Sequence, residues 1–325
     1  MTTSKRLWLR RTGILGMGVA LGLNAWSQTF PSRPIRLVVP YAAGGPTDQH
    51  VRAVADEAGK ILKQGITIDN RPGANGSLGA AAMSSATPDG YTLAIVPSVI
   101  FREPHMTKVS YDPLTSFSYI TLLSSYAFGF AVKADAPWKN WQEFAADAAK
   151  RPRMINAGAT GAVGTPRIGL EEAAEAARIE LNSAPFKSDV DVTNALLGGH
   201  IDAAVLTGVA MPHIEAGKMR YLAMMTERRV KRFPDLPTLK ELGVDVWVDS
   251  SYGLVGPRGM EPAVIRQIHE AFKAALESPA SVKVMDQLNQ SSSYKGPEDF
   301  RQYAVQSFHI ERTRVEKLRQ RGLLK

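Results

Sequence analysis

Two stretches of this chain place glycine, proline and hydroxyl-bearing residues where an apolar strand should pass into a helix. The first turn is residues 39–48, VPYAAGGPTD, and the second turn is residues 158–166, GATGAVGTP. Glycines let the backbone approach a ligand closely, and proline fits a first helical turn because its missing N–H would be unpaired there anyway. The free N–H groups and the positive end of the helix dipole predict an anion site at each turn. A tight turn without a ligand is the alternative.

Arg167 follows the second turn directly. A guanidinium near a helix N-terminus can hold a carboxylate through two parallel hydrogen bonds. The alternative is a surface ion pair with Glu171, one helical turn further on.

Other chemistries lack the residues that they need. The chain has no cysteine, which removes disulfides, thiolate metal sites and cysteine nucleophiles. Its histidines do not have the spacing of a zinc motif, its glycine runs lack the order of a nucleotide loop, and no Gly-x-Ser-x-Gly elbow occurs. Ser98, Ser250 and Ser251 are interpreted as hydroxyls that hydrogen-bond a ligand or the backbone. We therefore predict no metal, no cofactor and no catalytic residue.

The elements around the first turn alternate between strand and helix. Residues 35–39 predict a buried parallel strand. The helix after the turn should have one apolar face, formed by Val51, Val54, Ala55, Ala58, Ile61 and Leu62. Strands at 66–69 and 91–96, with a small-residue helix at 80–86 between them, complete a β-α-β-α-β pattern.

The second turn repeats this construction, with a strand at 154–156 before it and a helix at 167–177 after it. Further strands are predicted at 119–123, 128–132, 201–206, 219–225 and 246–255. Further helices are predicted at 141–149, 190–197, 213–216, 238–242, 262–276, 281–288 and from residue 297 onward. The charged end, residues 311–321, is interpreted as a solvated helical face.

A chain of 325 residues is long enough for two lobes, each with one glycine-rich turn. We predict an α/β fold in which each lobe is a mostly parallel sheet flanked by helices. Extended segments near 129–132 and 247–253 should cross between the lobes. The first lobe is then discontinuous, built from residues 28–130 and 249–325, and residues 131–248 form the second lobe.

The charge pattern and the N-terminus bear on partners and location. The formal net charge is +8, but lysines and arginines are spread along the chain, so we predict no nucleic-acid partner.

Residues 5–11 are basic, and residues 13–23 form an uncharged apolar stretch too short to span a bilayer. These features predict a signal peptide, residues 1–27, cleaved before Gln28. Arg10-Arg11 leaves general secretion and twin-arginine export both open, and an uncleaved anchor is the alternative to cleavage.

Several motifs resemble those of the Bug-type extracytoplasmic solute receptors, the binding proteins of tripartite tricarboxylate transporters. The resemblance covers essentially all of the mature chain in order. It lies in residues 34–48, PIRLVVPYAAGGPTD; 70–79, NRPGANGSLG; 88–93, PDGYTL; 158–171, GATGAVGTPRIGLE; 195–203, ALLGGHIDA; 212–220, PHIEAGKMR; 233–238, FPDLPT; and 252–257, YGLVGP.

The resemblance implies a two-lobe periplasmic-binding-protein fold of type II-like form that closes on a small carboxylated ligand, mostly through backbone N–H groups and ordered water. Carried over by position, the ligand-lining residues in the first lobe would be Tyr41, Gly44, Gly45, Thr47 and Asp48. Further candidates at strand ends and facing loops are Ser98, Gly161, Gly164, Thr165, Thr207 and Tyr252, with Arg167 added on its chemistry.

Three departures from the family pattern concern the ligand. Pro46 stands where a small residue is common and removes one N–H donor, and Arg167 stands where His or a neutral residue is usual. The run 186–189, FKSD, replaces a common Tyr-Lys-Gly and adds a negative charge, that of Asp189.

The resemblance implies a periplasmic, non-enzymatic receptor, expected as a monomer, that delivers its ligand to membrane permease subunits. The alternatives are a receptor that reports its ligand to a sensor kinase and, from another class, a secreted α/β enzyme. The second of these is disfavoured because no nucleophile–base pair or metal cluster is present.

Overall fold

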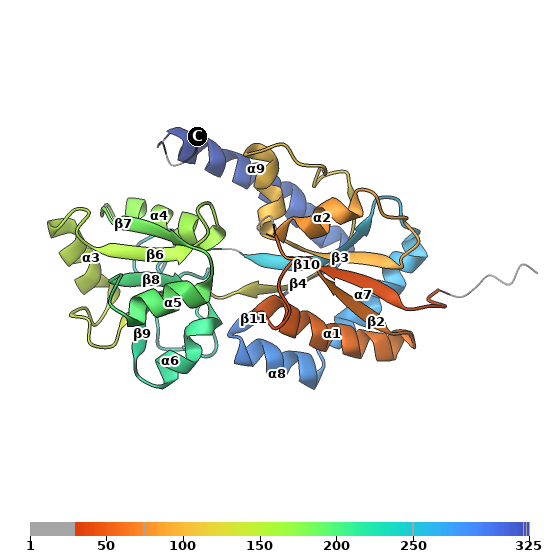
Figure 1. Ribbon diagram of the computed structural model, residues 1–325, viewed down its shortest axis with the longest axis horizontal. Coiled ribbons are helices and arrows are strands. Elements are labelled where there is room, and N and C mark those ends of the chain that lie inside the picture. Colours follow the sequence, from red (N-terminus) through yellow and green to blue (C-terminus); the bar gives the residue numbers. More distant parts are fainter. Residues whose placement is uncertain (1–29, 74–75, 249, 321, 323, 325) are drawn as a thin grey trace, which may run out of the picture.

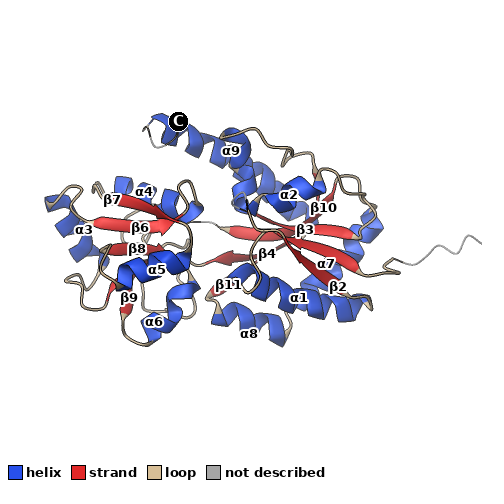
Figure 2. Cartoon of the chain, in the orientation of Figure 1, coloured by secondary structure: helices blue, strands red, loops and turns tan. Residues whose placement is uncertain are grey.

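The computed structural model describes residues 30–73, 76–248, 250–320, 322 and 324. The chain forms two α/β lobes side by side, each with its own sheet and covering helices (Figures 1 and 2). The predicted signal peptide lies outside the described residues, so its removal stays a prediction.

The sheet of the first lobe takes strands from both ends of the chain. Its order is β11 (Gln290–Lys295), β4 (Phe117–Tyr126), β10 (Ser251–Pro257), β3 (Thr92–Pro97), β1 (Ile35–Val39) and β2 (Ile66–Asn70). β1 pairs in parallel with β2 and β3, whereas β10 pairs antiparallel with β3 and β4, and β11 pairs antiparallel with β4.

Alternation along β1 explains how this sheet is covered. Ile35, Leu37 and Val39 point to a core shared with α1 (Pro46–Leu62) and α7 (Pro262–Leu276), with α8 (Pro279–Gln287) beside them. Val38 points to the opposite core, shared with α2 (Leu78–Met83) and α9 (Pro297–Gln320). A period of two therefore buries both faces, as expected for a strand inside a three-layer lobe.

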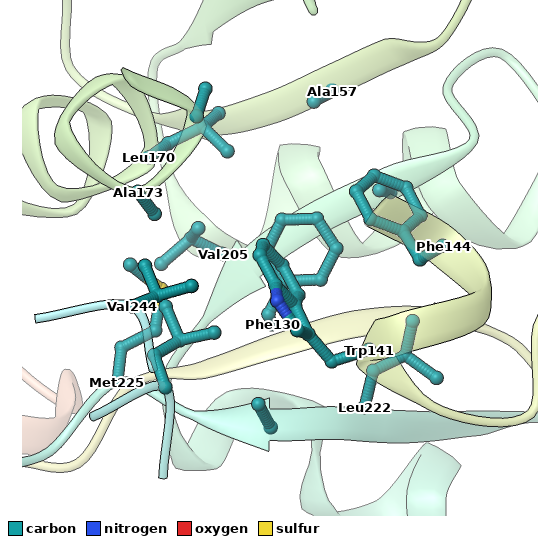
Figure 3. Close-up of a cluster of buried hydrophobic side chains, with 14 of the residues drawn as sticks. Phe130, Trp141, Phe144, Ala157, Leu170, Ala173, Val205, Leu222, Met225 and Val244 are labelled. Atoms are coloured by element: carbon teal, nitrogen blue, oxygen red, sulfur yellow. The ribbon is translucent and has the colours of Figure 1, made fainter. Parts of the chain in front are cut away.

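The second lobe has its sheet in the order β7 (Asn182–Phe186), β6 (Asn156–Thr160), β8 (Ala203–Leu206), β5 (Gly129–Lys133) and β9 (Met219–Met224). One face packs against α3 (Trp141–Lys150) and α4 (Thr165–Ala176), where Phe130, Trp141 and Phe144 form an edge-to-face aromatic group (Figure 3). The other face is covered by α5 (Asp189–Leu197) and α6 (Met211–Glu215).

Two segments pass between the sheets. β4 of the first sheet ends at Tyr126, and β5 of the second begins at Gly129. The return runs from the end of β9 at Met224 to the start of β10 at Ser251. α9 then extends from the first lobe across to the second (Figure 1). The exact lobe boundaries stay a prediction.

The two-lobe α/β fold is confirmed, with corrections. Each sheet is mixed, because antiparallel pairs accompany the parallel ones. Ile61 is half exposed rather than on the buried face of α1. The predicted strand at 154–156 begins at Asn156 and continues through Gly158 to Thr160.

Further boundaries also differ from the sequence patterns. The predicted helix at 238–242 is a succession of turns, and the strand predicted from 246 begins only at Ser251. β7 and β11 were not predicted, because NSAPF and QSSSYK carry few of the apolar or β-branched residues that mark a strand.

Candidate functional site

The first turn joins β1 to α1 as its sequence predicts. Gly45 is the extended N-cap residue and Pro46 is the first helical residue. Gly44 has φ +80°, a left-handed conformation that favours glycine. The N–H groups of Thr47 and Asp48 lie in the first helical turn, where no preceding carbonyl of the helix can accept them.

Asp48 holds this turn from within its own lobe. Its carboxylate accepts hydrogen bonds from the Gly44 N–H, Arg52 Nε and Asn70 Nδ2, each at 2.8 Å. Burial alone would raise the pKa of the carboxyl, but the bonds from Arg52, Asn70 and the Gly44 N–H hold the pKa below its usual value. Because three donors already occupy this carboxylate, Asp48 shapes the turn rather than presenting a free charge to an anion.

An aromatic layer lies beside α1. The Thr47 hydroxyl is hydrogen-bonded to the Tyr126 hydroxyl, and the rings of Tyr126 and Tyr252 have centroids 5.6 Å apart. The Tyr252 hydroxyl is 2.6 Å from His50 Nδ1. Burial lowers the pKa of His50 to about 4, so its imidazole is neutral at pH 7. Tyr41 packs against the same core as Tyr126 and Tyr252.

The second turn has the same construction on β6 and α4. Gly164 is the extended N-cap residue, and Pro166 lies in the first helical turn. Gly161 has φ +78°, and its N–H donates to the Phe186 carbonyl at 2.8 Å. A Cβ on Gly164 would lie 2.4 Å from the Thr160 carbonyl oxygen, so this position requires glycine.

Arg102 of the first lobe holds the second turn from across the lobe boundary. Its side chain is fully buried and donates to the Val163 carbonyl at 3.1 Å and to Thr165 Oγ1 at 3.4 Å. The same guanidinium binds both oxygens of Glu311 on α9, at 2.5 and 3.1 Å. A buried guanidinium that is fully paired can therefore fix the backbone of this turn.

The C-terminal part of α9 has an exposed charged face, as with Glu316 and Lys317, but its interpretation as a solvated face is incomplete because the other side is an interlobe contact. Glu311 is buried, and Arg314 donates to it at 2.6 Å and to Glu172 of α4 at 2.7 Å. Burial would raise the pKa of Glu311, but the charges of Arg102 and Arg314 lower it. Charged residues at helical spacing gave no sign of this burial, because their partners lie far away in the sequence.

A carboxylate that the sequence analysis named only as a departure from the family pattern lies at the ends of β6 and β8. Asp189, the first residue of α5, accepts hydrogen bonds from the hydroxyls of Thr160 and Thr207. Its charge raises the pKa of Tyr126, adding to the larger effect of burial. Tyr126 is therefore hydrogen-bonded to Thr47 of the first lobe and lies within range of the Asp189 charge of the second.

Arg167 is part-buried rather than on the surface. Its Nη2 lies 3.5 Å from Glu171 and 3.4 Å from the Ser183 carbonyl, which are long contacts. Its Nε is buried without a hydrogen-bond partner among the described residues. A ligand contact by Arg167 stays a prediction.

The structure groups some predicted residues and separates others. Thr47 is hydrogen-bonded to Tyr126, and Thr207 is hydrogen-bonded to Asp189, whose charge raises the pKa of Tyr126. Tyr252 is in the core behind Tyr126. Ser98 lies elsewhere, in the wall of a cavity of about 650 Å³ between α9 and the second lobe, with Glu172, Trp247 and Arg314.

Comparison with known proteins bears on this arrangement of two matched turns. The model of the tripartite tricarboxylate transporter family receptor matches residues 50–319. The chain belongs to this receptor family. A UPF0065 protein of Cupriavidus necator, named for the gbd 5′ region, is 39% identical over 97% of this chain and 98% of its own length.

Solved structures agree with the assignment. A TctC solute-binding protein from Polaromonas superimposes with a TM-score of 0.76 at 30% identity, covering 89% of this chain and 100% of that protein. MatC of Rhodopseudomonas palustris, solved with bound malate, superimposes with a TM-score of 0.75 at 26% identity, covering 88% of this chain and 100% of MatC. The chain is a solute-binding receptor of the TctC family, and the family predicted from the sequence is confirmed.

The described part of this TctC receptor lacks two features, a metal-binding cluster and a membrane-spanning helix. It contains no group of three or more His, Cys, Asp or Glu side chains arranged to hold a metal ion. None of the helices described there is long and apolar enough to cross a membrane.

Proposed function

We propose that this receptor captures a small organic carboxylate in the periplasm, between its lobes, and delivers it to the membrane permease of a tripartite transporter. The observation that carries the proposal is the pair of matching turns, one in each lobe. Each begins a helix with an extended glycine at the N-cap and a proline in the first helical turn. Each therefore offers N–H groups and a helix dipole to an anion.

The relatives support the same class of ligand. MatC, whose sheets and helices superimpose on those of this chain, holds malate. Closure of the lobes would be a hinge motion at the two segments that pass between the sheets. The receptor would act by binding alone, without catalysis.

Binding is tested by thermal-shift screening of a carboxylate library on the mature protein, followed by calorimetry. A bulky side chain at Gly45 obstructs the first turn, where an added Cβ already lies 3.2 Å from the Ala42 carbonyl oxygen. We expect Gly45→Val to weaken carboxylate binding by about tenfold or more, and His213→Ala, on α6, to leave it unchanged. A folded Gly45→Val protein with unchanged affinity would remove the anion-turn argument.

Delivery is tested separately from binding. Deleting the receptor gene should abolish uptake of the labelled ligand. In a strain that also lacks the permease, supplying the receptor should not restore uptake. If uptake survives the deletion while transcription no longer responds to the ligand, the sensor-kinase role replaces transport. Export is tested by N-terminal sequencing of the periplasmic protein, which should begin at Gln28.

A further inference from the structure

Asp189 is a carboxylate without a cation. Its two oxygens accept hydrogen bonds from the Thr160 and Thr207 hydroxyls. Among the described residues, no lysine, arginine or histidine forms an ion pair with it. A carboxylate has about four acceptor positions, so two hydroxyls leave acceptor capacity for a further donor.

The other carboxylates at the lobe boundary are different. Asp48 is paired with Arg52, and Glu311 is paired with Arg102 and Arg314. In each of these cases the protein supplies the positive charge. Among the described residues Asp189 has only neutral hydrogen-bond donors, so its charge is available to a positively charged group from outside the chain.

The location of Asp189 indicates which kind of ligand would carry the positively charged group. Thr160 ends β6 directly before the second turn, and Thr207 follows β8. Tyr126 is hydrogen-bonded to Thr47, which lies in the first helical turn of α1. The charge of Asp189 raises the pKa of the same tyrosine. The positive end of α1 and the negative charge of Asp189 thus belong to one interlobe region, with opposite signs on opposite lobes.

Resting on the proposed function, we propose that the ligand is an amino-acid-type zwitterion, with its carboxylate at the first turn and a protonated nitrogen at Asp189. A second carboxylate at this position would be repelled by Asp189, whereas an ammonium group would form charge-assisted hydrogen bonds with it. Asp189 is therefore a specificity-determining residue that selects against a ligand with a carboxylate at this position.

A purely structural role for Asp189 predicts a different result. Asp189 joins the ends of β6 and β8 to the start of α5, so its replacement can weaken the lobe and lower all affinities together. The preference between a protonated nitrogen and a carboxylate changes only if the negative charge of Asp189 acts on that group of the ligand. The experiment must therefore measure a ratio of affinities rather than one affinity.

The probes are pairs in which one member carries an ammonium group and its partner carries a carboxylate or a hydrogen in its place. They are β-alanine with succinate, γ-aminobutyrate with glutarate, L-aspartate with succinate, and L-glutamate with glutarate. Calorimetry on the mature receptor should show at least one amino-containing member binding about tenfold or more tightly than its partner. Asp189→Asn should reduce that ratio by about tenfold or more.

Asp191→Asn is the matched control. Asp191 lies in the same first turn of α5 and is exposed. Its carboxylate accepts a hydrogen bond from the hydroxyl of Ser188, the N-cap residue, and its N–H donates to the same hydroxyl. This variant should keep the wild-type ratio. Circular dichroism and a melting curve establish that both variants are folded.

Each outcome is decisive. A wild-type receptor that binds succinate or glutarate at least as tightly as the amino-containing partner in every pair, or an Asp189→Asn receptor with an unchanged ratio, overturns the zwitterion proposal and leaves carboxylate capture intact. If no carboxylate, amino or otherwise, binds to the folded wild-type receptor, the proposed function fails as well.

Discussion

The two glycine-rich turns have the same local construction but are held in different ways. The first is held within its own lobe, because Asp48 accepts the Gly44 N–H and is itself bound by Arg52 and Asn70. The second is held from the other lobe, where Arg102 donates to the Val163 carbonyl and to Thr165.

Because of this difference, only the second turn depends on how the two lobes are placed. The first turn keeps its supports wherever the second lobe lies. The second turn loses Arg102 if the lobes separate, so its backbone geometry is coupled to the interlobe arrangement. The first turn is therefore preformed within its lobe, whereas the geometry of the second depends on contact between the lobes.

The largest expected effect comes from removing the carboxylate that pairs with the buried Arg102 guanidinium. Glu311→Leu leaves the guanidinium without its carboxylate and also removes a partner of Arg314. Breaking a buried pair in this way costs about 3–5 kcal/mol of unfolding free energy. Chemical denaturation should show this loss.

Glu316→Leu, an exposed position on the same helix, is the control and should change stability by less than about 0.5 kcal/mol. A Glu311→Leu receptor as stable as wild type would show that Arg102 does not depend on Glu311, and the proposed contrast between the turns would fail.

Local sequence rules predicted the turns well, because their determinants lie within ten residues. Gly45 and Gly164 at the N-caps, with Pro46 and Pro166 just after them, follow from the preferences of a first helical turn. The same rules could not predict Arg102. Nothing around it in the sequence indicates a carboxylate 209 residues further on.

The next largest effect is a loss of unfolding free energy at acid pH, and it concerns the helix that follows the first turn. His50 lies on α1, is fully buried, and is bonded to Tyr252 and Ser281 of the same lobe. Burial lowers its pKa to about 4 from 6.5, so the unfolded chain binds a proton that the folded chain does not. This contribution to stability is complete above pH 6.5 and is lost as the pH falls toward 4, by about 3 kcal/mol.

The measurement is the unfolding free energy at pH 7.5 and at pH 4, for wild type and for His50→Gln. Carboxylates contribute to acid destabilisation in both proteins, so the difference between the two losses reports His50. Equal losses would contradict a neutral buried His50.

Strand order was the other feature that local patterns could not give. The β-α-β-α-β pattern at the start of the chain correctly predicted parallel pairing of β1 with β2 and β3. The antiparallel strands β10 and β11 arrive from the C-terminal part of the chain and insert beside β3 and β4. Their pairing depends on the return segment between the lobes, which has no local signature.

A smaller effect compares the two N-cap glycines directly. A Cβ at Gly164 would lie 2.4 Å from the Thr160 carbonyl oxygen, whereas at Gly45 the nearest atom, the Ala42 carbonyl oxygen, is 3.2 Å away. Both residues have ordinary negative φ. Steric contact of the added Cβ, rather than backbone strain, therefore determines the cost of each substitution. Gly164→Ala should cost about 1–3 kcal/mol and Gly45→Ala less than about 1 kcal/mol, as measured by denaturation. Equal costs would show that the second turn is as free to relax as the first.

The smallest expected effect concerns the outer interlobe contact. Arg314 and Glu172 join α9 to α4 at 2.7 Å, but both side chains remain about one-quarter exposed. Solvent screens such a pair, so a double-mutant cycle with Arg314→Gln and Glu172→Gln should give a coupling energy of about 0.2–1 kcal/mol that decreases with added salt.

Arg314 also contacts Glu311, and the cycle cancels that contact because it is lost equally in both backgrounds that contain Arg314→Gln. If the coupling instead approached the cost of Glu311→Leu, the outer pair would share control of closure with Arg102. The second turn would then depend on the whole length of α9 rather than on one buried guanidinium.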